Sequence, residues 1–258
     1  MLLAIDIGNT NVTFGVFDGE TIKATWRVST AIHRTPDEYA NLMLSLMERQ
    51  GISSAKLKDV VTCSVVPPLL IIFEEVCKRF LKKAPLIVEA GVKTGVRIDM
   101  DNPREVGPDR IVNAVAAHQL YGGPVIVIDL GTATTFDVVS KDGRYIGGAI
   151  APGIAIATEA LFTRTAVLPR IELALPKKAI GRNTVAAMQS GIVFGYIGLI
   201  EGLVSRIQAE LDEKATVVAT GGFAALTTQA TRAIDIVNSD LTLIGLRLIY
   251  NMNRGGKP

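Results

Sequence analysis

Short apolar runs separated by tight turns dominate the first 30 positions of the chain. The first run is Leu2–Ile7, and after a Gly-Asn turn a second run occupies Val12–Phe17. Asp18-Gly19 is typical of another tight turn, after which Thr21–Val28 forms a third run. Three β-type runs joined in this way predict an antiparallel meander.

A helical period replaces the strand pattern after residue 35. Pro36 opens an amphipathic pattern that runs to about Arg49, because proline favours the first turn of a helix. The apolar stripe of this helix consists of Tyr39, Leu42, Met43 and Leu46. A strand at 60–64, a helix from Pro67 and a strand at 86–88 follow. Strands that alternate with helices predict parallel crossover connections.

The same order of elements begins again at residue 125. Val125–Asp129 is a second buried run that ends on an acid and is followed by Gly131. Strands are predicted next at 135–140 and 145–150, and later at 216–220 and 234–237, with helices between them and a last helix from Asp240 to about Met252. We interpret this repetition as an internal duplication that produces two α/β domains joined near residues 110–120.

Composition and charge narrow the class of protein. The chain has 258 residues, of which 48% are hydrophobic and 20% charged, and this balance excludes intrinsic disorder. Its 27 basic and 25 acidic residues give a net charge of +2, which argues against a general nucleic-acid binder. The first residues lack the pattern of a signal peptide, and no apolar run approaches the roughly 18–20 residues of a membrane span. We therefore expect a cytoplasmic protein that binds a small molecule and neither nucleic acid nor membrane.

The cysteines agree with that location. Cys63 and Cys77 lie far from both histidines and show no zinc-binding spacing. We expect both to be buried, reduced thiols.

Two related motifs, Asp6–Asn11 and Asp129–Thr134, each follow a predicted buried strand. Each motif places a carboxylate at the strand end, followed by glycine and by hydroxyl or amide side chains in a tight turn. Glycine allows backbone N–H groups to approach an anion, Asn and Thr donate to phosphate oxygens, and Asp can hold a cation or its bound water. One copy alone is better explained as an ordinary hairpin turn. Two copies that each open one half of the chain favour a phosphate-binding pair.

A glycine pair adds a third element to this picture. Gly221 and Gly222 follow the strand predicted at 216–220, and a nucleotide base or sugar could lie flat against them. The sequence contains neither the Walker pattern G-x-x-x-x-G-K-[ST] nor the Rossmann pattern G-x-G-x-x-G. Phosphate binding is therefore expected at the hairpins and not at a helix N-terminus.

The two hairpin motifs and the glycine pair, in this order, resemble the superfamily of acetate and sugar kinases, heat-shock chaperones and actin. Together with the loop Asn102–Arg110, they resemble type III pantothenate kinases over essentially the whole chain. The resemblance implies an α/β fold of two duplicated actin-like (ribonuclease H-like) domains, with mixed sheets flanked by helices and a nucleotide cleft between the domains. We place these domains at residues 1–114 and 115–258. The implied activity is ATP-dependent phosphorylation of pantothenate to 4'-phosphopantothenate, the first step of coenzyme A biosynthesis.

The resemblance also assigns roles to individual residues. Asp109 would be the general base that accepts the proton of the acceptor hydroxyl, although helix capping also explains an acid at this position. Pantothenate contacts are implied for Met100, Gly107, Pro108, Asp109, Arg110 and Thr184. ATP contacts are implied for Asp6, Ile7, Gly8, Asn9, Thr10, Asn11, Val12, Thr13, Gly131, Thr132, Gly221 and Gly222.

Two acids are expected to hold cations. The resemblance implies that Asp6 positions magnesium through water and that Asp129 holds a monovalent cation, potassium or ammonium. The chain departs from the family at two positions, because relatives often have tyrosine in place of Met100 and alanine in place of Pro108. A methionine cannot donate the hydrogen bond that a tyrosine would.

Small residues recur along the helix expected from Thr184 to about Leu211. They are Ala187, Gly191, Gly195, Gly198, Gly202 and Ser205, and we call them the glycine stripe. Each glycine costs a helix about 1 kcal/mol relative to alanine, so we expect this face to meet another backbone closely. The partner is either the chain's own sheet and helices or a second copy of the chain. The resemblance favours a homodimer.

Two other functions stay open. A small-sugar kinase or polyphosphatase of the same superfamily would differ in its acceptor. A nucleotide-driven regulator or filament protein would need no acceptor pocket, so the loop Gly107–Arg110 counts against it. Residues 164–183, rich in Pro, Lys and Arg, are expected to form either a lid or a surface loop.

Overall fold

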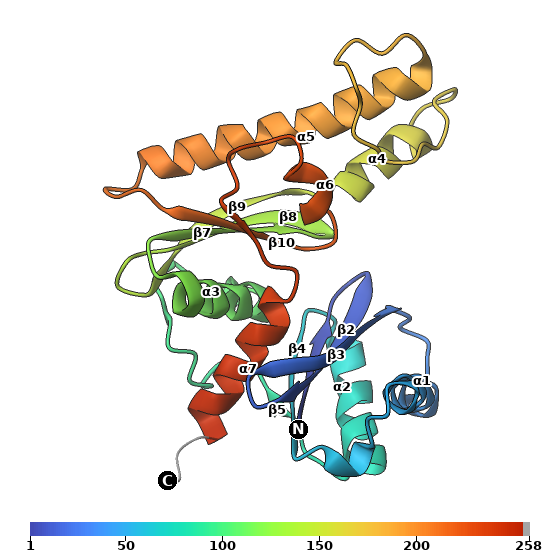
Figure 1. Ribbon diagram of the computed structural model, residues 1–258, viewed down its shortest axis with the longest axis vertical. Helices are drawn as coiled ribbons and strands as arrows, with labels where there is room; N and C mark the ends of the chain where they lie inside the picture. The colour runs from blue at the N-terminus through green and yellow to red at the C-terminus, as the bar shows by residue number, and fades with distance from the viewer. Residues whose placement is uncertain (255–258) are drawn as a thin grey trace. The chain divides into compact units, whose positions relative to one another are not determined.

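A computed structural model describes residues 1–254, and the chain divides into two compact units (Figure 1). The first unit contains Met1–Val96, Asn102–Ala116 and the chain from Thr242 onward, and the second contains Arg97–Asp101 and Ala117–Leu241. The division after Ala116 lies two residues beyond the boundary expected between 1–114 and 115–258, and two further segments differ from that expectation. The last helix belongs to the first unit, and residues 97–101 belong to the second.

The first unit is built on a five-stranded sheet with the order β3-β2-β1-β4-β5. Strands β1, β2 and β3 form the predicted antiparallel meander, whereas β1, β4 and β5 are parallel to one another. The bounds of these strands are Leu2–Ile7 for β1, Asn11–Asp18 for β2, Thr21–Ser29 for β3, Asp59–Ser64 for β4 and Leu86–Ile87 for β5.

One face of this sheet is covered by α1 (Pro36–Arg49) and α2 (Pro67–Val76) (Figure 1). Tyr39 of α1 and Phe73 of α2 pack with their rings tilted by 50° and their centroids 4.7 Å apart, in the core against the odd-numbered residues of β1. The buried positions of α1 are Tyr39, Ala40, Met43 and Met47, so the buried stripe is rotated from the predicted one, and Leu42 and Leu46 are only half-buried. Short helical turns at Ser54–Lys56, Cys77–Leu81 and Pro103–Glu105 complete the unit.

The opposite face of the first sheet packs against α7 (Leu241–Arg254), which in turn contacts the first turns of α3 (Pro108–Tyr121). A Cβ on Gly15 of β2 would lie 2.8 Å from the Leu243 side chain, so α7 approaches the strand closely. Thr242 Oγ1 donates a hydrogen bond of 2.7 Å to Asn113 Oδ1 of α3. These contacts explain why the last helix joins the first unit.

The second unit repeats this topology. Its six-stranded sheet has the order β11-β10-β7-β8-β9-β6, in which β9-β8-β7-β10-β11 corresponds to β3-β2-β1-β4-β5. Strands β1 and β7 have the same burial pattern. Every residue is buried except the motif aspartate, Asp6 in β1 and Asp129 in β7, which is half-buried. The bounds are Arg97–Ile98 for β6, Val125–Leu130 for β7, Ala133–Val139 for β8, Arg144–Pro152 for β9, Thr216–Thr220 for β10 and Ile236–Val237 for β11. The predicted duplication is confirmed, and β6 is an added edge strand.

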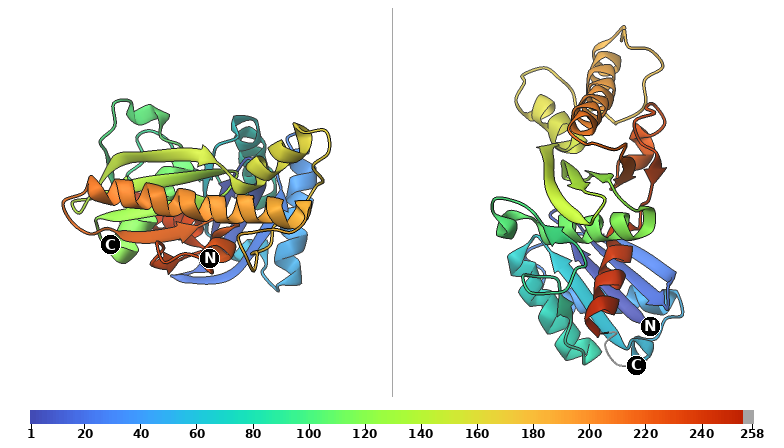
Figure 2. Two further views of the ribbon diagram at one scale, coloured as in Figure 1. Left: turned by 90° about the horizontal axis from the view of Figure 1, so that it is seen from above. Right: turned by 90° about the vertical axis from the view of Figure 1, so that its left-hand side faces the viewer.

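Three helices belong to the second unit: α4 (Ile154–Thr163), α5 (Thr184–Ala209) and α6 (Ala224–Thr227). Helix α5 lies along one face of the sheet (Figure 2), and Ile200 packs there against Ile126 and Phe136. Residues 164–183 contain neither helix nor strand. This loop is held to α5 by Ser190 Oγ, which donates to Ala179 O at 2.5 Å, and by Gln189 Nε2, which donates to Glu172 O at 2.8 Å.

Among the described residues, only α5 is long and apolar enough to cross a membrane by length and composition. Its most apolar window has a mean hydropathy of 1.4, and 39% of that window is buried within the chain. The expectation that no apolar stretch is as long as a membrane span is therefore wrong by this criterion. Glycines and polar residues interrupt the apolar run, but the mean hydropathy of the helix stays high. A core helix of a soluble protein passes the same test, so the finding is weak evidence for a membrane.

Candidate active site

The first expected phosphate motif is the turn between β1 and β2. Gly8 N donates to Asn11 O at 3.0 Å and closes the turn, while Thr30 Oγ1 donates to Gly8 O at 2.6 Å from the end of the meander. The side chains of Asn9 and Thr10 are exposed at its tip. Hydrogen bonds to the backbone of Gly8 therefore fix the turn, and its polar side chains face solvent.

Asp6 lies at the end of β1 in a row of side chains that crosses the sheet. The strand register places it opposite Thr13 of β2 and Cys63 of β4, and Thr13 in turn is opposite Arg27 of β3. Cys63 Sγ donates a hydrogen bond to Asp6 Oδ1 at 3.4 Å. Cys63 and Cys77 are both buried free thiols, as predicted.

The side chains of Ile7 and Val12, two of the residues assigned to ATP, do not lie on the face of the sheet that carries Asp6. Ile7 and Val12 are fully buried in the core between the sheet and helices α1 and α2. Only their backbone atoms could therefore face a ligand bound at the turn, whereas Asp6 and Thr13 project from the opposite face of the sheet.

Asp109 lies in the first turn of α3. Ile111 N donates to Gly107 O at 3.2 Å, which makes Gly107 the residue that caps the helix and Pro108 its first residue. Asp109 Oδ1 accepts a hydrogen bond of 2.8 Å from Arg110 N, so the carboxylate is held against the helix terminus. A Cβ on Gly107 would lie 2.6 Å from Asp109 Oδ1, and glycine is therefore the residue that leaves room for this conformation.

The two acids of the first unit interact. The pKa of Asp6 is raised to about 7, mainly by burial and then by the charge of Asp109, while the hydrogen bond from Cys63 and the charge of Arg27 act in the opposite direction. The pKa of the Cys63 thiol is also raised, first by burial and then by Asp6 and Asp109. A buried carboxylate whose pKa is raised by a second carboxylate marks a site in which a cation would be stabilised.

The second motif is the turn between β7 and β8, and glycines from two other segments enclose it. A Cβ on Gly221, whose φ is +92°, would lie 2.5 Å from Asp129 Oδ1, and a Cβ on Gly153 would lie 2.2 Å from Thr132 O. Gly153 N donates to Thr132 O at 3.1 Å, and Phe223 N donates to Leu130 O at 3.2 Å. The structure thus brings Asp129, Gly131, Thr132 and the glycine pair together within the second unit.

The remaining expected substrate residues lie on other elements of the second unit. Met100 follows β6, and a Cβ on Gly147 of β9 would lie 3.4 Å from its sulfur. Thr184 is the first residue of α5 and is exposed, directly after the N-cap Asn183, whose side chain accepts from Ala186 N.

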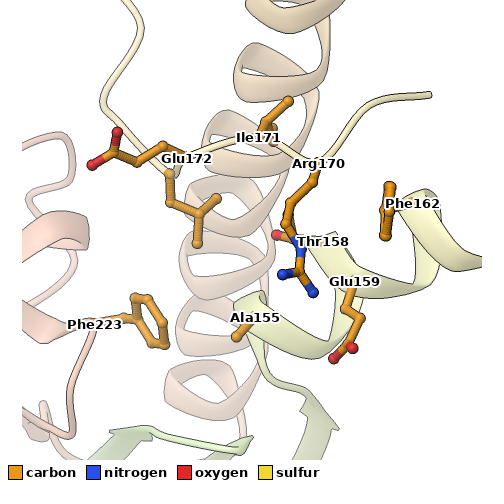
Figure 3. A pocket seen from close by; sticks show the side chains of 9 residues that line it. Ala155, Thr158, Glu159, Phe162, Arg170, Ile171, Glu172 and Phe223 are labelled. Atoms are coloured by element: carbon orange, nitrogen blue, oxygen red, sulfur yellow. The ribbon is translucent and has the colours of Figure 1, made fainter.

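A pocket of about 450 Å³ lies within the second unit (Figure 3). Helix α4, the loop segment 170–173 and Phe223 form its walls. The guanidinium carbon of Arg170 lies over the ring of Phe162, 5.4 Å from the ring centroid. None of the residues expected to bind ATP or pantothenate lines this pocket, although Phe223 directly follows Gly222.

Three residues of these sites were missed by sequence reasoning. Cys63 was interpreted as a core thiol, and Arg27 and Gly153 were given no role. The duplication could have indicated a role for Cys63. Strands β4 and β10 occupy equivalent places in the two sheets, and each ends beside the aspartate of its phosphate motif. Gly153 lies directly after β9, where it contacts the second turn.

Comparisons with known proteins agree with this geometry. A family model described as type III pantothenate kinase matches residues 2–206. A type III pantothenate kinase of Dehalococcoides mccartyi is 59% identical over 253 residues, which cover 98% of this chain and 96% of that protein.

Two solved structures share the fold at low sequence identity. A conserved putative Baf family transcriptional activator from Campylobacter jejuni has a TM-score of 0.62 at 20% identity, and the match covers 98% of this chain and 99% of that one. A putative 2-dehydro-3-deoxygalactonokinase from Sinorhizobium meliloti has a TM-score of 0.57 at 11% identity, over 98% and 99% of the two chains. These likenesses confirm the expected fold class and show the fold alone. The family model and the nearly full-length relative together establish that this chain belongs to the type III pantothenate kinase family.

Proposed function

We propose that this chain phosphorylates pantothenate with ATP to give 4'-phosphopantothenate, the first step of coenzyme A biosynthesis. Membership of the type III pantothenate kinase family is the observation that carries this proposal. The charge of Asp109 acts on Asp6 within the first unit. This interaction supports the proposal, because phosphoryl transfer needs a cation site and a base near each other.

Asp109 is the proposed general base. It accepts the proton of the primary hydroxyl of pantothenate as that oxygen bonds to the γ-phosphorus of ATP and the bond to the β–γ bridging oxygen breaks, releasing ADP. The backbone N–H of Arg110 fixes one carboxylate oxygen of Asp109, which orients the group. Arg110 is assigned to the carboxylate of pantothenate, which suits its planar fork of donors. Gly107, Pro108, Met100 and Thr184 are assigned to the rest of this substrate.

The turn residues from Gly8 to Thr13 are assigned to the phosphates, with Thr132, Gly131 and the glycine pair. Mg²⁺ would be held near Asp6 through water and would neutralise charge on the transferring phosphoryl group. The described residues contain no group of three or more His, Cys, Asp or Glu side chains that could hold a metal ion. This donor set fits Mg²⁺, which takes one or two carboxylates and completes its shell with water and substrate phosphates.

A monovalent cation, potassium or ammonium, is assigned to Asp129. Its carboxylate lies close to Gly221, and the carbonyl oxygens of Gly131 and Thr132 lie close to Gly153. Oxygen donors of this kind fit such an ion. The cation would reduce the repulsion between Asp129 and the nucleotide phosphates.

A coupled assay of ADP formation tests the activity. We expect turnover that requires both Mg²⁺ and pantothenate and that rises when K⁺ or NH₄⁺ replaces Na⁺. Turnover with hexoses and none with pantothenate would identify a sugar kinase instead. ATP hydrolysis that ignores pantothenate and accompanies nucleotide-dependent assembly would identify a regulator or filament protein.

We also propose that the chain acts in the cytoplasm as a homodimer joined along the glycine stripe. Gly191, Gly195 and Gly198 are exposed, and a Cβ at any of them would meet no heavy atom of the described residues within 4 Å beyond the helix's own neighbouring backbone. Close packing against the chain's own sheet therefore does not account for these glycines. An exposed stripe without side chains is a surface that a second helix can approach closely.

Substitution on the stripe tests the dimer. Gly195→Leu is expected to convert dimers to monomers in sedimentation velocity without unfolding the chain, since the space at this position is open. Gly195→Ala is the matched control: it should retain the dimer and gain up to about 1 kcal/mol of helix stability. A wild-type chain that sediments as a monomer at micromolar concentration, or a Gly195→Leu variant that remains dimeric, would rule out this seam.

A further inference from the structure

Cys63 is a buried nucleophilic side chain beside Asp6 to which the proposed mechanism gives no role. It lies in β4, fully buried, and is opposite Asp6 in the parallel pairing of β1 with β4. Its sulfur lies 3.4 Å from Asp6 Oδ1. A thiol has one hydrogen to donate, and here that hydrogen is directed at the carboxylate assigned to magnesium.

The duplicated sheet supplies an independent comparison. In the second sheet β10 takes the place of β4, and the residue opposite Asp129 is Thr220, which is 2% exposed. Both sheets therefore bury a side chain that carries a donor hydrogen beside the motif aspartate, on the parallel neighbour strand. An apolar residue would satisfy packing equally well at a buried strand position, so packing alone does not explain the shared donor.

We infer that Cys63 is a positioning residue, which fixes the orientation of the Asp6 carboxylate for the hydrated magnesium ion of the nucleotide complex. The inference rests on the proposed function, since that function gives Asp6 its role. Partners that orient a metal-binding group typically change metal affinity by about 10–100-fold when they are removed. The thiol is a weak donor and the metal is reached through water, so we expect a smaller change of about 3–10-fold.

Metal binding by the folded chain tests this inference. Mn²⁺ replaces Mg²⁺ in the presence of a non-hydrolysable ATP analogue, and free Mn²⁺ is measured by electron paramagnetic resonance. Cys63→Ala and Cys63→Val, which lack the donor hydrogen, are expected to weaken Mn²⁺ binding by about 3–10-fold. Cys63→Ser keeps a donor hydrogen and is expected to restore most of the affinity.

Cys77→Ala is the matched control, because Cys77 is also a buried thiol of the first unit but packs in the core on the other face of the sheet. It should leave Mn²⁺ affinity at the wild-type value. Equal affinities in the wild-type, Cys63→Ala and Cys63→Val proteins would overturn the inference, as would an equal loss in Cys77→Ala. Neither outcome bears on whether pantothenate is the acceptor, which the ADP assay decides separately.

A spectroscopic measurement needs no destabilising change at position 63. In Cys77→Ser protein the only thiol is Cys63, so its S–H stretching band can be followed by infrared difference spectroscopy. A thiol that donates to Asp6 should shift to the frequency of a weaker hydrogen bond in the Asp6→Asn background, because an amide oxygen is a poorer acceptor than a carboxylate. An S–H band that does not move would overturn the inference even if the Cys63→Ala and Cys63→Val chains fail to fold.

Discussion

Asp109→Asn is expected to reduce kcat by about 10²–10⁴-fold while leaving the binding of an ATP analogue intact. An asparagine side chain can still accept the hydrogen bond from Arg110 N, so the start of α3 should keep its conformation. It cannot take up the proton of the acceptor hydroxyl, and the chemical step loses its base. Steady-state assays with saturating pantothenate, combined with calorimetric titration of the ATP analogue, separate these two effects.

The competing explanation is that Asp109 only stabilises a helix terminus. Helix α1 offers a matched control, because Pro36 and Asp37 occupy the same first two helical positions as Pro108 and Asp109. An acid in the first turn contributes about 0.3–1 kcal/mol to helix stability. We expect Asp37→Asn to leave turnover at the wild-type value and only Asp109→Asn to reduce it. Near-wild-type turnover in Asp109→Asn would remove this residue from the mechanism.

Local sequence patterns were sufficient for most elements of this fold. Helix α1 spans the predicted residues Pro36 to Arg49, and Thr35 and Glu38 form a capping box that fixes where it begins. The hairpins at β1 and β7 were predictable because apolar runs, an acid and a glycine occur together within a few residues. In each case the information lies within about one turn of helix or one hairpin.

Features that depend on long-range packing were not predictable. The two-residue strand β6 is too short to produce a pattern, and its pairing with β9 depends on a neighbour 47 residues away. The membership of α7 in the first unit depends on contacts such as Leu243 with Gly15. The hydrogen bond from Cys63 to Asp6 joins residues 57 apart and exists only because of the register between β1 and β4.

Asp6→Asn is expected to stabilise the metal-free chain while it abolishes activity. The unfolded chain loses the Asp6 proton as pH rises through about 3.9, whereas the folded chain keeps it until about pH 7. Between these values the folded state binds more protons, so the free energy of unfolding falls as pH rises. The full difference is at most about 4 kcal/mol above pH 7, and because the side chain is only half-buried we expect about 2–3 kcal/mol.

The midpoint of thermal unfolding should therefore show how much the charged Asp6 carboxylate lowers the stability of the folded chain. In metal-free buffer at pH 8, Asp6→Asn is expected to unfold about 5–10 °C above the wild-type chain, and near pH 4 the two should coincide. Asp18→Asn, which removes an exposed carboxylate at the other end of β2, is the matched control and should show no such pH-dependent gain. In an Asp109→Asn background the gain should shrink, because the charge that raises the pKa of Asp6 is gone. A gain that is the same at pH 4 and pH 8 would show that charge at Asp6 is not its cause. We therefore expect Asp6→Asn to be more stable and inactive. The buried negative charge of Asp6 destabilises the metal-free chain, and a bound cation would offset that cost.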